Sequence, residues 1–245
     1  MAKLAPITMA GLSPERKEMY RKAAARPSRE IYIELKLHNQ KTSIAAYNAG
    51  QQYRLNFKLN GANIPMRYRT ASINDEKPYI SGTNDQSKLW HVAQQYIQKF
   101  NNGKGIGLML HGGIGTGKTH LVCAIGNDLL KEDKTVAYTT IKEVVAGVQN
   151  SWKGDGELDF YNALTQPDLL ILDEIGVQKD SDFERTVIST ITDKRSRECK
   201  STIAISNLPP EKISKMMGKR AYDRITAGGK YLFSLNGSSL RSVFG

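Results

Sequence analysis

The segment GGIGTGKT, at positions 112–119, has the residue types that bind a nucleoside triphosphate. It matches the pattern G-x-x-x-x-G-K-[ST] in full and lies between an apolar run and a helical pattern, the context that this pattern requires. Four of its residues are glycines: Gly112, Gly113, Gly115 and Gly117. Glycine permits positive φ angles, so successive N–H groups can turn inward around phosphate oxygens. Lys118 is expected to reach the β- and γ-phosphates and the Thr119 hydroxyl to ligate Mg²⁺, which predicts binding of ATP or ADP with Mg²⁺.

Two carboxylates follow the next buried run, DLLILDEIG, at positions 168–176. A strand that delivers acids at its carboxyl end suits a metal–nucleotide site. Asp173 would hold the Mg²⁺ shell, directly or through water, and Glu174 would orient and deprotonate an attacking water. Apolar runs that end in Asp-Glu are common by themselves. Behind a phosphate loop, the pair indicates hydrolysis rather than phosphoryl transfer to a small acceptor.

Further polar residues stand downstream. Asn207 ends the apolar run 202–206 and would either touch the γ-phosphate or the attacking water, or satisfy a turn before two prolines. Arg220 and Arg224 have the i,i+4 spacing of one helical face, and Arg241 lies near the end of the chain. These arginines either form surface ion pairs or supply a cation to the γ-phosphate, in cis or in trans.

The elements that must position these residues alternate between strand and helix from residue 105 onward. Strands are expected at 107–110, 135–139, 168–172, 202–206 and 231–235. Helical patterns are expected at 87–100, 118–131 and 182–197. Such alternation predicts an α/β fold with a parallel sheet covered on both faces. The phosphate loop then lies at the carboxyl edge of the sheet, where such sheets bind ligands.

The basic charge of the chain is concentrated near its start. The 245 residues have a net charge of +11; residues 1–70 hold 13 Lys and Arg against 4 Asp and Glu, whereas residues 101–245 hold 19 against 17. This asymmetry suggests either an acidic partner or a solubilising surface, and charge alone does not decide between them. We expect a basic region at 1–60, a linker at 61–85 and an ATPase domain at 86–245. Periodicity does not settle the secondary structure of residues 28–60.

Composition also indicates the compartment. No apolar run approaches the roughly 18 residues of a membrane span, and the first residues do not resemble a secretory signal. Cys123 and Cys199 are read as ordinary reduced thiols. We expect a cytoplasmic protein that has no membrane partner.

In this order, GGIGTGKTH, LLILDEIGVQ, ISN and GKRAYDR resemble the bacterial and phage replicative helicase loaders of the DnaC type, which are AAA+ ATPases. The resemblance covers about residues 65–245. It implies an AAA+ P-loop fold, with a central parallel sheet flanked by helices, plus a small, mainly helical, basic N-terminal domain. It also implies a slow ATPase that assembles as a hexameric spiral and delivers a DnaB-type hexameric helicase onto single-stranded DNA, contacting the helicase through residues 1–60.

The resemblance assigns roles by position. Asn207 becomes the first sensor, and Arg241 becomes the second sensor, which reads the γ-phosphate in cis. Arg224 becomes the arginine finger supplied to a neighbouring subunit, with Arg220 beside it. The other residues of the nucleotide site would be Gly112, Gly113, Gly115, Thr116, Gly117, Lys118, Thr119, His120, Asp173 and Glu174.

The resemblance also places DNA contacts. The loaders carry a helical insertion that helps to hold DNA, here residues 142–164, with Trp152 at the position of the DNA-contacting aromatic. Trp152 and Lys153 lie in a Gly-rich polar turn, where an aromatic is poorly explained as core, and a base stacked on such a ring contributes about 1–3 kcal/mol. A local hydrophobic cluster is the alternative for Trp152. Ser181 and Phe183 match a second contact loop.

Three other classes share parts of these motifs. The transposition-helper ATPases of the IstB type have the same fold and nearly every catalytic residue, and differ mainly in the N-terminal region and the partner. A kinase with a small acceptor usually lacks the Asp-Glu pair and has no need for Arg220 and Arg224. An adaptor with a vestigial site is opposed by the four intact residues Lys118, Thr119, Asp173 and Glu174.

Overall fold

The structure is a computed structural model of the 245-residue chain. It describes residues 14, 17–18, 61–74, 84–100, 105–151, 157–177, 181–227, 231–237 and 239. The chain divides into two compact units, Met1–Arg54 and Leu55–Gly245. In the first unit the described residues Pro14, Lys17 and Glu18 are helical; the other expectations for residues 1–54 lie outside the described part. The architecture below is that of the second unit.

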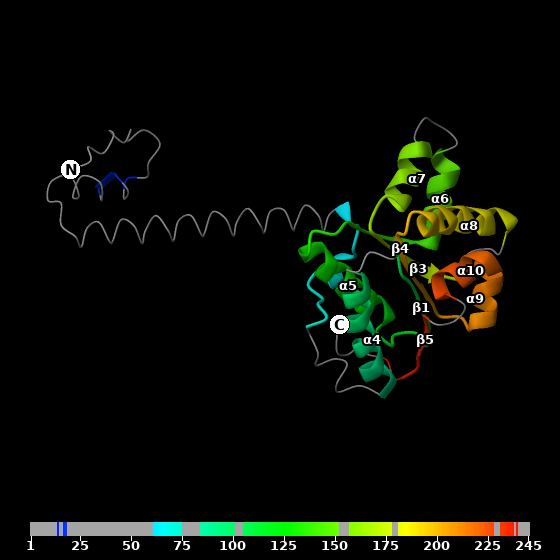
Figure 1. Ribbon diagram of the computed structural model, residues 1–245, viewed down its shortest axis with the longest axis horizontal. Helices are drawn as coiled ribbons and strands as arrows, with labels where there is room; N and C mark the ends of the chain where they lie inside the picture. The colour runs from blue at the N-terminus through cyan, green and yellow to red at the C-terminus, as the bar shows by residue number, and fades with distance from the viewer. Residues whose placement is uncertain are drawn as a thin grey trace. The chain divides into compact units, whose positions relative to one another are not determined.

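The second unit is built on a five-stranded sheet in the order β2-β3-β4-β1-β5, and every pairing is parallel (Figure 1). Its strands are β1 (Gly107–Gly112), β2 (Val136–Thr140), β3 (Leu169–Ile175), β4 (Ser201–Ser206) and β5 (Leu232–Leu235). The predicted parallel sheet is therefore confirmed. Its strands are near-continuous apolar runs because both faces of the sheet are covered.

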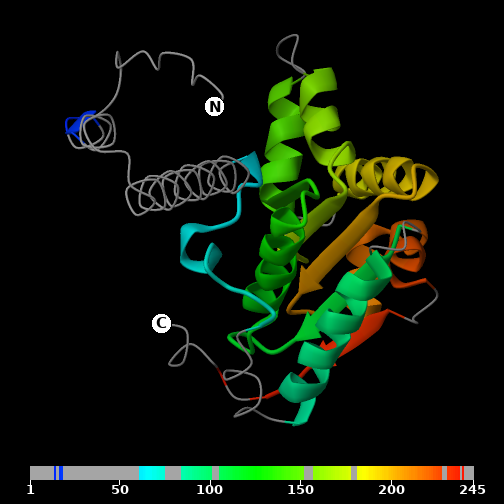
Figure 2. The ribbon, with the colours of Figure 1, turned by 60° about the vertical axis from the view of Figure 1, so that its left-hand side comes forward.

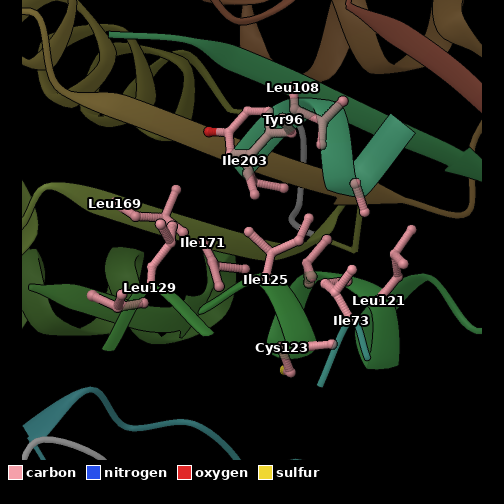
Figure 3. Close-up of a cluster of buried hydrophobic side chains, with 14 of the residues drawn as sticks. Ile73, Tyr96, Leu108, Leu121, Cys123, Ile125, Leu129, Leu169, Ile171 and Ile203 are labelled. Atoms are coloured by element: carbon pink, nitrogen blue, oxygen red, sulfur yellow. The ribbon is translucent and has the colours of Figure 1, made fainter. Parts of the chain in front are cut away.

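Helices cover both faces of the sheet, as Figure 1 shows. One face carries α4 (Asn84–Phe100) and α5 (Lys118–Lys131). The other carries α6 (Ile141–Ser151), α7 (Glu157–Thr165), α8 (Asp182–Arg197), α9 (Pro210–Met217) and α10 (Lys219–Thr226). Side chains alternate between the two layers along each strand: Leu108 and Leu110 pack with α4 and α5, whereas Met109 packs with the other layer. Figure 3 shows Ile125 of α5 meeting Ile171 and Ile203 of the sheet in the first layer.

A segment before the first strand, residues 61–74, packs on this domain, and we call it the strap. It includes a short 3-10 helix, η1 (Met66–Tyr68), and runs alongside α5 (Figure 2). Four of its side chains are buried in the core: Ala62, Ile64, Ala71 and Ile73. This part of the expected linker 61–85 thus contributes to the ATPase unit. The domain boundaries expected from the sequence stay predictions.

Polar side chains of α5 tie the strap down. The side-chain amide of Asn127 donates to the carbonyls of Tyr68 and Ala71, at 2.7 and 2.8 Å. The Asp128 carboxylate accepts from the Ser72 hydroxyl at 2.9 Å. The phosphate loop leads directly into α5. The strap and the phosphate loop are therefore attached to the same helix.

Arg195, on α8, is fully buried at the amino end of the sheet. Its guanidinium donates to the Thr202 hydroxyl and to the carbonyls of Leu164, Thr165, Pro167, Asp168 and Ser201. Burial lowers the pKa of Arg195 to about 10, so it still carries its charge at neutral pH. One side chain thereby joins α8 to the end of α7 and to the starts of β3 and β4.

We expect Arg195→Met to lower the free energy of unfolding by at least about 3 kcal/mol, because each buried acceptor left without a donor costs about 1–3 kcal/mol. Urea unfolding followed by circular dichroism measures this loss. Arg197→Met is the matched control, since Arg197 is exposed on the same helix and should change stability by about 0.5 kcal/mol at most. Equal stability of the two variants would refute the clamp.

None of the helices in the described part of the chain has the length and apolar character to span a membrane. Cys123 is buried and Cys199 is exposed, and both are free thiols.

Candidate active site

The phosphate loop connects β1 to α5, which begins at Lys118. Three of its glycines have positive φ angles: 131° at Gly112, 80° at Gly115 and 96° at Gly117. Gly113 does not, so the expectation of a positive φ at this position is wrong. The loop closes on itself through the buried Thr116, whose hydroxyl donates to the Gly113 carbonyl at 3.0 Å.

Gly112 has a second reason to be glycine. It pairs with Leu235 of β5, and a Cβ on Gly112 would lie 2.3 Å from the Leu235 carbonyl oxygen. A Cβ on Gly113 would meet the Thr116 side chain at an ordinary 3.4 Å. The first glycine therefore permits close approach of β5, whereas the second has room for a small side chain.

The Lys118 ammonium is held inside the loop. The residue is 5% exposed, and its Nζ donates to the carbonyls of Gly112 and Gly113 at 2.9 and 2.5 Å. Burial lowers the pKa of Lys118 to about 8, and the charge of Asp173 acts in the opposite direction. The ammonium thus lies among backbone groups that curve around the phosphate position, at the positive end of α5.

The Asp173 carboxylate joins three elements at the carboxyl edge of the sheet. Its Oδ2 accepts from the Thr119 hydroxyl at 3.0 Å and from the Tyr138 hydroxyl at 2.7 Å, and its Oδ1 accepts from the Glu174 N–H at 2.6 Å. Burial and the nearby Asp173 charge raise the pKa of Tyr138, so its hydroxyl stays protonated and donates. A hydroxyl and a carboxylate oxygen side by side are the hard ligands that Mg²⁺ prefers, so Thr119 and Asp173 fit this ion.

Glu174 lies in a bulge at the end of β3. Its φ is 60°, and the β3–β4 pairing shifts register between Leu172 and Ile175. A bulge re-aims the side chain that it carries, and strained backbone of this kind clusters at functional sites. The result is that Asp173 is buried whereas Glu174 is exposed and lines the nucleotide cavity.

The end of β4 is tied to this bulge. The Ser206 hydroxyl, which is buried, donates to the Ile175 carbonyl at 2.5 Å and accepts from the Leu208 N–H at 3.1 Å. Asn207 lies between these bonded residues and faces the same cavity as Glu174. One hydroxyl group therefore joins the backbone next to both side chains.

These groups surround one cavity of about 200 Å³. Its walls include the expected residues Gly115, Gly117, Lys118, Thr119, His120, Asp173, Glu174 and Asn207. Arg67 and Tyr68 of the strap complete it, and the sequence reading missed both because they stand in the stretch read as a linker. The Arg67 guanidinium lies 4.7 Å from the centre of the Tyr68 ring, which meets His120 edge-on at 6.1 Å.

A family model described as IstB-like ATP binding protein matches residues 21–241. The replicative helicase loader DnaC of Escherichia coli (strain K12) is 30% identical over 202 residues, which are 82% of this chain and 81% of that protein. The chain belongs to the DnaC/IstB family of ATP-binding proteins.

One further relative and two solved structures are also similar to this chain. The uncharacterized protein YdaV of Escherichia coli (strain K12) is 37% identical over 193 residues, 78% of this chain and 76% of that protein. The crystal structure of the DnaC helicase loader has a TM-score of 0.62 at 22% identity and covers 70% of this chain and 100% of that one. The structure of AMPPCP-bound DnaA from Aquifex aeolicus has a TM-score of 0.58 at 21% identity, and the match covers 73% of this chain and 53% of that chain. The expected AAA+ P-loop fold is thereby confirmed.

Two of the three arginines that the resemblance assigned to the nucleotide, Arg220 and Arg224, are not among the residues that line the cavity of this DnaC/IstB family member. Arg224, on α10, forms an ion pair with Asp193 of α8 at 2.5 Å. It borders a small cavity with Gly107, the first residue of β1, and so lies at the amino edge of the sheet, opposite the phosphate loop. Arg220 is exposed on the same helix. Arg241 lies outside the described residues.

The residues expected to contact DNA are partly described. The insertion 142–164 forms α6 and α7, which pack so closely that a Cβ on Gly147 would lie 2.0 Å from the Phe160 ring. Trp152 and Lys153, between these helices, lie outside the described residues.

The second expected contact, at the start of α8, has local structural roles. The Ser181 hydroxyl caps the helix by accepting from the Glu184 N–H at 3.2 Å, and the Glu184 carboxylate closes the capping box. Phe183 is partly buried against the core layer of α6 and α8–α10. Any DNA contact there would add to these roles.

We expect Gly112→Ala to weaken ATP binding by at least about tenfold, because the strained φ alone costs about 1–3 kcal/mol and the new Cβ meets β5. Fluorescence titration with a labelled ATP analogue measures the affinity. Gly113→Ala is the matched control and should bind within about twofold of the wild type, since a Cβ there has ordinary contacts. Unchanged binding by Gly112→Ala would contradict the close-approach argument.

Proposed function

We propose that this protein is an ATP-dependent loader, which binds a DnaB-type hexameric replicative helicase and delivers it onto single-stranded DNA. The observation that carries the proposal is the similarity to a replicative helicase loader over 82% of the chain. The geometry of the nucleotide cavity supports the ATP-dependent part. The loader would act in the cytoplasm, as expected from the sequence.

The proposed reaction is the hydrolysis of ATP to ADP and phosphate. Mg²⁺ would neutralise charge on the β- and γ-phosphates. Lys118 and the loop N–H groups would hold these phosphates, and Thr119 and Asp173 would hold the metal. Glu174 accepts a proton from the water that attacks the γ-phosphorus, and Asn207 orients that water. The proximity of these side chains around one cavity supports this division of roles.

The proposed active form is an oligomer, in the manner of a hexameric spiral. Arg224 lies at the amino edge of the sheet and the phosphate loop lies at the carboxyl edge, so Arg224 would serve the site of a neighbouring subunit. Arg220 would assist it, and Arg241 would read the γ-phosphate in cis. A subunit that lacks a neighbour would hydrolyse ATP slowly, because an arginine finger accelerates such reactions by about 10³–10⁵-fold.

Mixing two inactive variants tests the trans role of Arg224. We expect Arg224→Ala to bind ATP with nearly unchanged affinity and to lose about a thousandfold or more in turnover within the assembly. Glu174→Gln should also bind ATP and fail to hydrolyse it. A mixture should recover activity, because a Glu174→Gln subunit can offer its Arg224 to the intact site of an Arg224→Ala neighbour. A mixture as inactive as its components would place the arginine in cis.

The remaining partners are assigned to other parts of the chain. The basic region 1–60 would contact the helicase, since most of the excess positive charge lies there. Trp152 would stack on a base of single-stranded DNA, with Lys153, Ser181 and Phe183 near the strand. The match to an IstB-like family model is also compatible with one alternative, a transposition helper that binds DNA and regulates a transposase. The two functions differ in partner rather than in nucleotide chemistry.

A binding assay with purified partners separates the two functions. The Glu174→Gln variant, held with ATP and Mg²⁺, should retain the DnaB-type helicase encoded by the same genome on size-exclusion chromatography. The fragment 55–245 should lose the helicase and keep ATP binding, because it contains the whole described nucleotide cavity. Retention of the helicase by the fragment would overturn the docking assignment. Binding of a transposase in place of the helicase would favour the IstB-type alternative.

A further inference from the structure

Tyr138 lies directly behind the metal-binding side of the nucleotide cavity, and none of the motifs includes it. Its hydroxyl donates to Asp173 Oδ2 at 2.7 Å, and the residue is 8% exposed. We propose that Tyr138 is a positioning residue of the Mg²⁺ site, whose hydroxyl holds the Asp173 carboxylate in the orientation that meets the metal beside Thr119. The inference rests on the Mg²⁺ role proposed above for Asp173 and Thr119.

The register of the sheet explains how Tyr138 reaches Asp173. Tyr138 of β2 is directly opposite Ile171 of β3, and Asp173 lies two residues further along β3, on the same face. The tyrosine ring spans this diagonal, as the hydrogen bond from its hydroxyl to Asp173 at 2.7 Å shows. The hydroxyl at the end of the ring therefore meets the carboxylate at the carboxyl edge, while the ring stays in the core.

The three donors to the Asp173 carboxylate differ in whether they also take part in the proposed reaction. Thr119 would itself ligate the metal through its oxygen, so the position of its hydroxyl would depend on the metal. The Glu174 N–H belongs to the bulge that carries the proposed general base. Tyr138 contacts neither the metal nor the water in the proposed mechanism. Of the three, it is the donor suited to keep the carboxylate still while the other groups exchange partners.

Tyr138 is itself firmly held, as a positioning residue must be. Its ring belongs to the buried cluster that includes Cys123 of α5. Its N–H donates to the Ala62 carbonyl at 2.7 Å, and its carbonyl accepts from the Asn63 side-chain amide at 3.4 Å. The strap thus pairs with the outer side of β2, and β3 pairs with the inner side. With both sides of the strand occupied, the hydroxyl has a defined position relative to Asp173.

The test compares two buried tyrosines that each lose one hydroxyl. We expect Tyr138→Phe to raise the dissociation constant for Mn²⁺, a spectroscopic substitute for Mg²⁺, by about tenfold or more, since loss of a partner of a metal ligand typically costs 10–100-fold. Electron paramagnetic resonance measures free Mn²⁺ in the presence of a non-hydrolysable ATP analogue. Affinity for the analogue in EDTA should stay within about twofold.

Tyr96→Phe is the matched control. The buried Tyr96 hydroxyl donates to the Ile106 carbonyl at 2.9 Å, just before β1 and at the opposite edge of the sheet from the phosphate loop. This variant also loses one buried hydroxyl and its hydrogen bond, and it should bind Mn²⁺ as the wild type does. An equal loss of metal affinity in both variants would reduce the effect to general destabilisation and overturn the proposal.

Two other results would overturn it as well. Unchanged Mn²⁺ affinity in Tyr138→Phe would show that Asp173 is oriented without the hydroxyl. Tighter binding would show that the hydroxyl competes with the metal for Oδ2 instead of positioning it. A different result would be a wild-type protein that binds the analogue but no Mn²⁺. That result would contradict the Mg²⁺ role of Asp173 in the proposed function itself.

Discussion

The buried guanidinium of Arg195 is the constraint on which the sheet depends. It spreads one positive charge over five carbonyl oxygens and a hydroxyl, and no other single side chain described here joins α7, α8, β3 and β4. Arg195 holds the amino ends of β3 and β4 in place. Because the two strands are parallel, their carboxyl ends then lie side by side at the ligand-binding edge of the sheet. The carboxyl edge can then accommodate a strained residue, Glu174 at a φ of 60°, because Arg195 holds β3 and β4 at the opposite edge.

At the carboxyl edge, the active site is organised around the Asp173 carboxylate. It receives donors from α5, β2 and the bulge of β3, so the phosphate loop, the edge strand and the proposed general base share one acceptor group. The strap 61–74 packs on α5, pairs with β2 and lines the cavity with Tyr68. In sequence it follows the basic N-terminal region.

Local patterns predicted the parts of this structure that short-range chemistry determines. The five parallel strands, the phosphate loop and the Asp-Glu pair follow from apolar runs and glycine spacing, and the predicted fold is confirmed. Arg195 could not be found in this way, because a charged helical stretch reads as a solvated face until the elements around it are placed. The sequence did not predict the strap because its turn-forming residues indicated a linker, although four of its side chains are buried. Tyr138 reads as an ordinary core aromatic, since its partner Asp173 lies 35 residues away.

The ion pair between Arg224 and Asp193 bears on why assembly would depend on the nucleotide. In the single chain Arg224 is already neutralised, and Asp193 Oδ1 is buried. Withdrawing the guanidinium would leave this oxygen without its cation, at a cost that is moderated because the two side chains are 28% and 29% exposed. In the proposed assembly, the γ-phosphate of ATP in a neighbouring subunit would carry more negative charge than one carboxylate and would offset that cost. ADP has no γ-phosphate, so after hydrolysis Arg224 would return to Asp193 and the contact between subunits would weaken.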